Sequence, residues 1–155
     1  MDRSDIERVL NGCEFFRGLD PAAIREIAGL CAVETCEPGR FIYRQGEFGV
    51  RIYVIAQGQV ALERSLDLGA RKGTAAIGQL GPGRVFGCWS TLLDEAHNFM
   101  SSACCRKETR LISLKGADLR AMMLRNPALG FQVLQRLCLV LRERIQAVYG
   151  AMEKI

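Results

Sequence analysis

The chain has 155 residues, of which 49% are hydrophobic and 25% are charged, and its formal net charge is +4. This composition is typical of a globular domain and excludes a disordered or collagen-like protein. The basic residues are scattered apart from three arginines near the C-terminus, so we expect no surface that tracks a nucleic-acid duplex. The N-terminal stretch MDRSDIERVL lacks the apolar segment of a signal peptide, and no apolar run is long enough to cross a bilayer. We expect a cytoplasmic protein that has no membrane partner.

The cysteines point to a reduced protein without a metal site. Their number is odd and no signal peptide precedes them, which favours free thiols over disulfides. None of the spacings is the Cys-x-x-Cys that zinc sites favour, so we expect small buried side chains and no metal. The seven are Cys13, Cys31, Cys36, Cys88, Cys104, Cys105 and Cys138.

Residues 1–31 are expected to form helices. Ser4 followed by Glu7 fits a capping box, and Asp20 followed by Pro21 fits the first turn of a second helix.

Residues 32–114 consist of short alternating runs separated by glycine, such as FIYR, RIYVIA and QVALERS. The alternation predicts half-buried strands, and the glycines predict tight turns between them. About eight strands with no long helix among them indicate an antiparallel β-roll, similar to a jelly roll, rather than a parallel sheet. With the flanking helices, the predicted fold class is α+β, in a single domain over residues 1–155.

Residues 115–155 are expected to be helical, with a break at Asn126 and a new helix beginning at Pro127. In that last helix apolar residues recur at alternating spacings of three and four, which is a heptad seam. The seam favours pairing with the same helix of a second chain, in a parallel or antiparallel homodimer, and a second apolar face formed by Val133, Leu137 and Val140 is available for the domain itself. The seam residues are Phe131, Leu134, Cys138, Leu141, Ile145, Val148 and Met152.

The order of elements and the motifs RFIYRQGEFGVRIYVIAQGQVAL (40–62) and GPGRVFG (81–87) resemble the cyclic nucleotide-binding domain of the catabolite-activator regulators. The resemblance covers nearly the whole chain. It implies a β-roll, a short inner helix after Phe86 and Gly87 whose backbone N–H groups meet a cyclic phosphate, and a C-terminal dimerisation helix. A helix N-terminus attracts anions, and glycine allows close approach, so we expect Gly87 to Ser90 to cradle the ligand. The family's turn glycines match Gly39, Gly46, Gly58, Gly83 and Gly87.

The segment 86–100, which we call the cassette, departs from the family at its two charged positions. The family has Glu after the Phe-Gly pair and Arg roughly ten residues later, whereas this chain has Cys88 and either Asn98 or Phe99. The resemblance implies that this Arg pairs with the phosphate of the ligand. Losing such a charge-assisted contact costs about 1.5–3 kcal/mol of binding free energy. With these replacements, we expect a more apolar pocket. The candidate ligand-binding residues are Phe86, Gly87, Cys88, Trp89, Ser90, Asn98, Phe99, Ser101 and Ser102.

We therefore expect a non-catalytic regulatory module that senses a small ligand, with a cyclic nucleotide such as cAMP as one candidate, and that signals through its dimer helix to a partner regulatory protein. One alternative is a ligand-free dimerisation scaffold whose pocket is plugged by Trp89 or Phe99. Another is a haem or redox sensor using Cys88 and His97, although a single histidine is weak evidence and haem is not expected.

No catalytic motif is visible, since the chain has no Ser-His-Asp order, no phosphate-binding loop of nucleotide hydrolases and no paired carboxylates near its one histidine. The related transcription factors carry a helix-turn-helix domain after the dimerisation helix. Only six residues follow Tyr149, so direct DNA binding is not expected unless the sequence belongs to a longer regulator.

Overall fold

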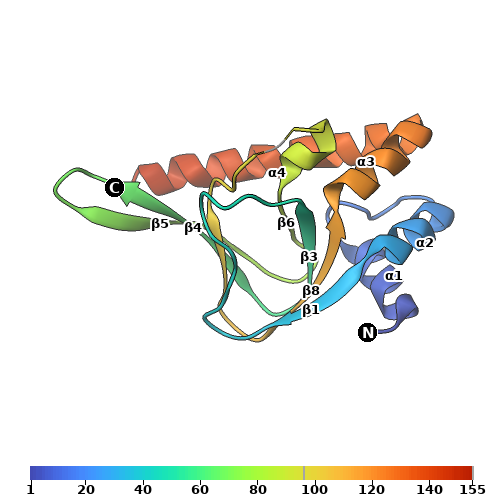
Figure 1. Cartoon of the computed structure of the whole chain (residues 1–155), viewed down its shortest axis with the longest axis horizontal. Helices are drawn as coiled ribbons and strands as arrows, with labels where there is room; N and C mark the ends of the chain where they lie inside the picture. Colours follow the sequence, from blue (N-terminus) through green and yellow to red (C-terminus); the bar gives the residue numbers. More distant parts are fainter. Residues whose placement is uncertain (96, 155) are drawn as a thin grey trace.

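The structure, a computed structural model, describes residues 1–95 and 97–154. Eight strands form two four-stranded antiparallel sheets, preceded by two helices and followed by two more (Figure 1). The predicted α+β roll with a long C-terminal helix is therefore confirmed. Ala96, inside the expected cassette, and Ile155, at the end of the expected helical region, lie outside the described residues. The elements are α1 (Arg3–Gly12), α2 (Pro21–Leu30), β1 (Ala32–Cys36), β2 (Phe41–Tyr43), β3 (Arg51–Gln57), β4 (Val60–Asp67), β5 (Lys72–Leu80), β6 (Val85–Gly87), the 3-10 helix η1 (Trp89–Leu93), β7 (Ser102–Cys105), β8 (Thr109–Lys115), α3 (Gly116–Arg125) and α4 (Pro127–Met152).

The strand order is β1-β8-β3-β6 in one sheet and β2-β7-β4-β5 in the other. The β4–β5 hairpin extends beyond the rest of the roll at the left of Figure 1, where its tip lies toward the C-terminal end of α4. Strand β5 contacts α4. The long helix therefore runs along the roll and its projecting hairpin.

Side-chain alternation on the strands divides the interior into two cores. On β3, Ile52 and Val54 join a core with the helices, whereas Tyr53 and Ile55 face the inside of the roll. Neighbouring residues on a strand point to opposite faces, so one strand serves both cores. The core inside the roll is rich in aromatic rings.

Helices α2 and α4 begin where the sequence predicts, whereas the N-cap residue of α1 differs from the predicted one. The N-cap of α1 is Asp2 and not the predicted Ser4: its Oδ1 accepts from the Asp5 N–H at 2.8 Å, and its own N–H donates to Asp5 Oδ2 at 3.2 Å. An aspartate caps as well as a serine, so either residue satisfied the pattern. Asp20 caps α2 and Asn126 caps α4, in each case followed by proline.

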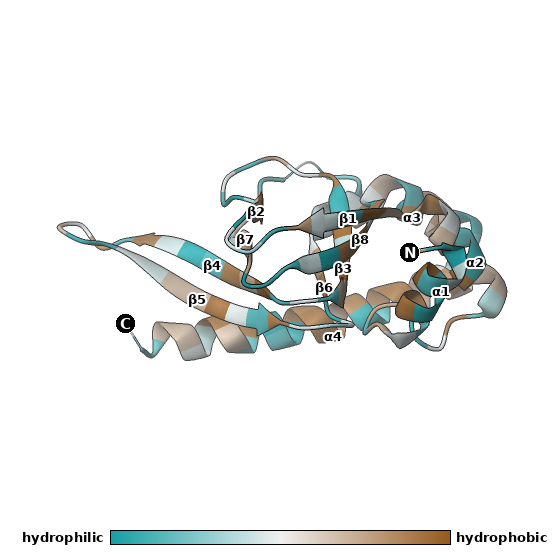
Figure 2. Ribbon diagram, turned by 90° about the horizontal axis from the view of Figure 1, so that it is seen from below, coloured by the Kyte–Doolittle hydropathy of each residue, from teal (hydrophilic) through white to brown (hydrophobic). Residues whose placement is uncertain are grey.

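Helix α4 has one face on its own domain. Val133, Leu137 and Val140 are buried, as the second apolar face predicted, while Phe131 remains 66% exposed. In Figure 2 hydrophobic segments recur along much of α4. None of the described helices combines the length and the hydropathy that a bilayer span requires.

Candidate functional site

A cavity of about 700 Å³ lies between the roll and α4. Its walls come from the cassette and Ser101, from β2, β4 and β5, and from residues 137–149 of α4, so it joins segments that are far apart in the sequence. The lining side chains are mostly apolar or aromatic. The residues that line it are Tyr43, Leu62, Arg64, Ile77, Phe86, Gly87, Cys88, Trp89, Ser90, Leu93, Glu95, His97, Asn98, Phe99, Met100, Ser101, Leu137, Leu141, Arg144, Ile145, Val148 and Tyr149.

The first half of the cassette is held against β3. Gly87 has φ +129°, and a Cβ there would lie 2.5 Å from the carbonyl oxygen of Arg51. The Cys88 N–H donates to that same oxygen at 3.0 Å. The packing of β6 on β3 thus requires glycine at position 87. The Cys88 N–H is hydrogen-bonded to β3 and is not free to bind a ligand. Of the backbone groups expected to cradle a ligand, those at the start of η1 are the ones not engaged by β3.

The second half of the cassette places an aromatic ring inside the roll. The Phe99 N–H donates to Glu47 O at 2.8 Å, and the Gly46 N–H donates to Phe99 O at 2.8 Å. These bonds fix the backbone, and the Phe99 ring then stacks on Tyr43 with centroids 3.6 Å apart and an interplanar angle of 8°. Burial raises the pKa of the Tyr43 hydroxyl, the Tyr53 and Cys88 groups adding to that effect and Arg144 opposing it. Tyr43 is therefore a neutral, largely apolar wall.

The cavity brings together eight of the nine predicted ligand residues. The ninth, Ser102, is outside the lining, and its hydroxyl accepts the Gln45 N–H at 2.9 Å. Trp89 lines the cavity, but its ring also packs toward the N-terminal helices, 5.7 Å from the ring of Phe15. The Phe99 ring therefore occupies part of the interior of the roll, and the cavity lies beside it.

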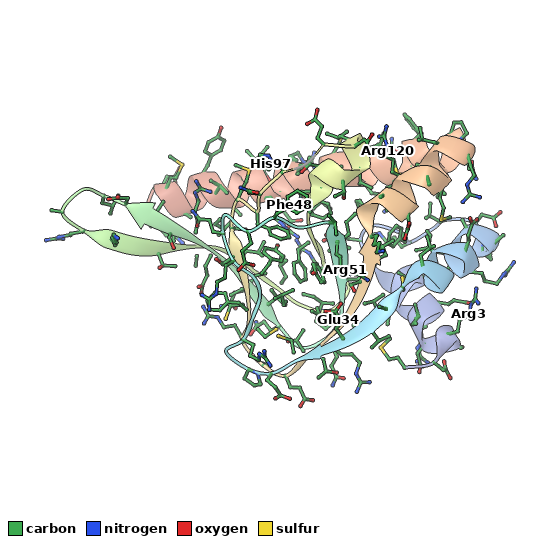
Figure 3. The ribbon with its side chains drawn as sticks, viewed as in Figure 1. Arg3, Glu34, Phe48, Arg51, His97 and Arg120 are labelled. Carbon is green, nitrogen blue, oxygen red and sulfur yellow. The ribbon has the colours of Figure 1, made fainter. Side chains whose placement is uncertain are left out.

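Cys88 and His97 do not converge on a metal-like site. The buried Cys88 Sγ lies 3.6 Å from Ser90 Oγ and 4.0 Å from the carbonyl oxygen of His97, while the His97 side chain is exposed. Figure 3 shows His97 near Phe48 at the upper edge of the roll. Among the described residues, no group of three His, Cys, Asp or Glu side chains could hold a metal ion.

Sequence reasoning missed the two arginines of the cavity. Arg64 comes from β4, and its guanidinium donates to the Met100 carbonyl oxygen. Arg144 comes from α4, and its side chain is only 15% exposed. Burial lowers the pKa of Arg144, an effect that Glu14 opposes. A signal for Arg144 was present, because it continues the spacing of Leu137 and Val140 on the inward face, where a charged residue is unusual.

The predicted dimer seam divides into two parts. Phe131, Leu134, Cys138 and Met152 are exposed and do not line the cavity. Leu141, Ile145 and Val148 belong to the seam and also line the cavity.

A sequence profile described as the cyclic nucleotide-binding domain matches residues 33–126. The cyclic AMP receptor protein of Thermus thermophilus is 33% identical over 134 residues, which cover 86% of this chain and 60% of that protein. This chain therefore spans about three fifths of that relative's length.

The fold of this chain is similar to that of solved crystal structures, among them the two that follow. The catabolite activator protein of Thermus thermophilus has a TM-score of 0.69 and 31% identity, covering 87% of this chain and 61% of that one. A cyclic nucleotide-binding domain from Methylobacillus flagellatus has a TM-score of 0.79 at 19% identity, covering 99% of this chain and 84% of that one, and it bears on the fold alone.

Proposed function

Because the chain belongs to the cyclic nucleotide-binding domain family, we propose that it is a non-catalytic regulatory module that senses a small ligand in the cavity and signals through α4 of a homodimer. The signal would pass to a partner regulatory protein.

One observation carries the link. Leu141, Ile145 and Val148 lie on the seam of α4 and also line the cavity. A ligand that contacts these side chains can favour one arrangement of α4 over another, and only such differential contact shifts a conformational equilibrium. The cavity and the seam therefore have three residues in common, so a ligand in the cavity can act on the seam directly.

Exposure of the seam supports the homodimer. Phe131 is 66% exposed and Met152 is 60% exposed, at opposite ends of the helix, while the face that includes Val133 and Leu137 is buried on the chain's own domain. A helix with a second apolar face left in solvent is typical of a coiled-coil partner.

Cyclic nucleotides are the family's ligand and the first to test. Cys88 and the segment from Asn98 to Phe99 replace the Glu and Arg of the family cassette, so a weaker complex is expected. Loss of one charge-assisted contact corresponds to about 10- to 100-fold in affinity. The affinity for cAMP and cGMP should therefore be low, and a less polar ligand should bind better.

The test measures binding and dimer geometry together. Calorimetric titration with cAMP and cGMP, up to millimolar concentration, gives the affinity. Hydrogen exchange of α4 with and without ligand gives the response of the helix. The proposal expects protection to change over the cavity-lining turns that include Leu141 and Ile145; binding without any change in α4 would refute the coupling.

The seam has its own test. Phe131→Ser combined with Leu134→Ser removes exposed seam residues that do not line the cavity, so the variant should sediment as a monomer while its roll remains folded. Leu124→Ser, at an exposed leucine of α3 that is 67% accessible, is the matched control and should leave the dimer intact. A double variant that still dimerises would exclude the seam as the interface.

A ligand-free scaffold is a second candidate, favoured by the stack of Phe99 on Tyr43 inside the roll. It expects a dimer of the same seam but no saturable binding at the cavity. The titrations above distinguish it from the sensor.

A further inference from the structure

Arg144 enters the cavity from α4 with few partners. Its Nη2 donates to the Val85 carbonyl oxygen at 2.9 Å, and this is the one hydrogen bond that the described residues provide for the group. The carboxylate oxygens of Glu14 and Glu143 lie 3.5 and 3.9 Å from its nitrogens, long for charged hydrogen bonds. A guanidinium carries five N–H donors in a planar fork, so most of this fork is free to bind something else.

The nearest carboxylate is already shared. Glu14 Oε1 accepts the Val85 N–H at 2.8 Å, and Glu14 Oε2 lies 3.1 Å from Arg84 Nε. Arg84 also bonds Glu143 at 2.5 Å. Glu14 and Glu143 together match the charges of Arg84 and Arg144, but both lie nearer to Arg84, so the Arg144 fork keeps unused N–H donors.

The Arg144 side chain is only 15% exposed, so its charge is partly removed from water. A guanidinium remains protonated in proteins, and a charge taken out of water must be repaid by hydrogen bonds and an opposite charge. Burial is the largest cause of the lowered pKa of Arg144, while the carboxylates of Glu14 and Glu143 act in the opposite direction. An acid group that reached the free side of the fork would accept the hydrogen bonds that Glu14 and Glu143 do not make.

The rest of the cavity defines the body of such a ligand. Among the described lining residues, Arg64 and Arg144 are the arginines and Glu95 is the one carboxylate, while Glu14 and Glu143, which pair with Arg144, lie outside the lining. Most of the remaining wall is apolar or aromatic, and the lining has Cys88 where the family has Glu. The lining therefore suits a molecule with one negative charge and few other polar groups.

We propose that the ligand of this cavity is a small molecule with an apolar, preferably aromatic body and one acid group, and that the acid group binds Arg144. This inference rests on the proposed function, because it names the ligand class of the same cavity. The apolar body lies among Phe86, Phe99 and Leu137, and the acid group lies at the junction of α4 with β6. Binding therefore tightens α4 on the roll through a residue of α4 itself.

The test uses two dyes that share their ring system and differ in one acid group. Anilinonaphthalene sulfonate carries a sulfonate, and phenylnaphthylamine carries none. Trp89 is the chain's one tryptophan and lines the cavity, so energy transfer from Trp89 to the dye reports binding near it. We expect the sulfonate to bind about 10- to 100-fold more tightly than the neutral dye, as one charge-assisted contact provides.

Variants localise the acid group. Arg144→Met should remove the preference for the sulfonate, so that the two dyes bind with similar affinity. Arg142→Gln is the matched control, because Arg142 is an exposed residue of the same helix outside the lining, and it should change neither affinity. Arg144→Lys keeps the charge and should retain part of the preference, which protects the test if Arg144→Met fails to fold.

The outcomes separate the two proposals. Equal affinity for both dyes at the Trp89 site, or an equal loss of preference in Arg142→Gln and Arg144→Met, would overturn the acid-binding role while leaving a ligand cavity in place. No binding of either dye near Trp89 would overturn the sensor function, and this inference with it.

Discussion

The position of Phe99 can be tested by a double-mutant cycle with Gly49. A Cβ at Gly49 would lie 2.0 Å from Phe99 Cζ and 2.2 Å from Cε2, so the ring occupies the space that any other residue at 49 would need. The Gly49 backbone is not in the left-handed region, so the ring is the main obstacle to alanine. Gly49→Ala must push Phe99 off its stack with Tyr43.

The magnitudes follow from the contacts. Overpacking in Gly49→Ala should cost about 1–3 kcal/mol, and Phe99→Ala, at a buried ring, should cost about 3–5 kcal/mol. In the Phe99→Ala background the added methyl group has room, and replacing glycine should instead stabilise by about 0.4–1 kcal/mol. The coupling between the two sites should therefore be about 1.4–4 kcal/mol and should make the double variant more stable than additivity expects.

Urea unfolding followed by circular dichroism measures the cycle, with thermal unfolding as a second readout, where each kcal/mol corresponds to about 2–4 °C in Tm for a chain of this size. Phe99→Leu replaces Phe99→Ala if the larger truncation prevents folding. Gly73→Ala is the control, since nothing lies within 4 Å of a Cβ there, and it should show no coupling to Phe99. If Gly49→Ala lowers the free energy of unfolding equally in both backgrounds, the Phe99 ring does not lie over Gly49, and the described position of Phe99 is wrong.

Three further predictions concern the backbone, a helix cap and pH. Gly87→Ala combines a φ of +129° with a Cβ 2.5 Å from a β3 carbonyl oxygen, so it should cost about 2 kcal/mol or more in thermal unfolding, whereas Gly73→Ala should be close to neutral; equal effects would contradict the strain argument. Asn126→Ala removes the side-chain acceptor for the Leu129 N–H at 3.2 Å and should destabilise the protein by about 0.5–2 kcal/mol, with Asn126→Asp retaining most of the stability. Burial raises the pKa of Cys13 to about 11 and that of Cys105 to about 12, from 9.0, so the fold favours the neutral thiols. Their contribution to stability is complete below pH 9 and is lost as the pH rises toward 11 and 12, so Tm should fall over that range, and Cys13→Ala should flatten the fall; an identical slope in the variant would refute this cause.

Residue patterns within single segments of the sequence predicted the main strands and helices. Strand β3 was predicted as a half-buried strand, and the strand is present, but it is buried on both faces because Ile52 and Tyr53 serve different cores. Helix α4 was visible because its apolar residues repeat at helical spacing after Asn126 and Pro127, which cap and start it. These features depend on local periodicity, and a sequence displays periodicity directly.

The capping residue of α1 shows the limit of such patterns. Asp2 and Ser4 both suit an N-cap, and two residues of shift change which one takes the role. The sequence supplied the motif, while the geometry of the first turn decided between the candidates.

The contents of the site depended on tertiary structure. The sequence indicated that the Glu and Arg of the family cassette are replaced, but it did not show that Phe99 stacks on Tyr43 across more than fifty residues of chain, nor that the Ser102 hydroxyl is used by Gln45. It also did not show that Arg144 shares a cavity with Arg64. Composition and periodicity determined which elements form and which faces are apolar, because those are properties of neighbouring residues. Which side chains meet in the cavity was decided only when the two sheets and α4 packed together, because contacts between distant residues leave no periodic signal in the chain.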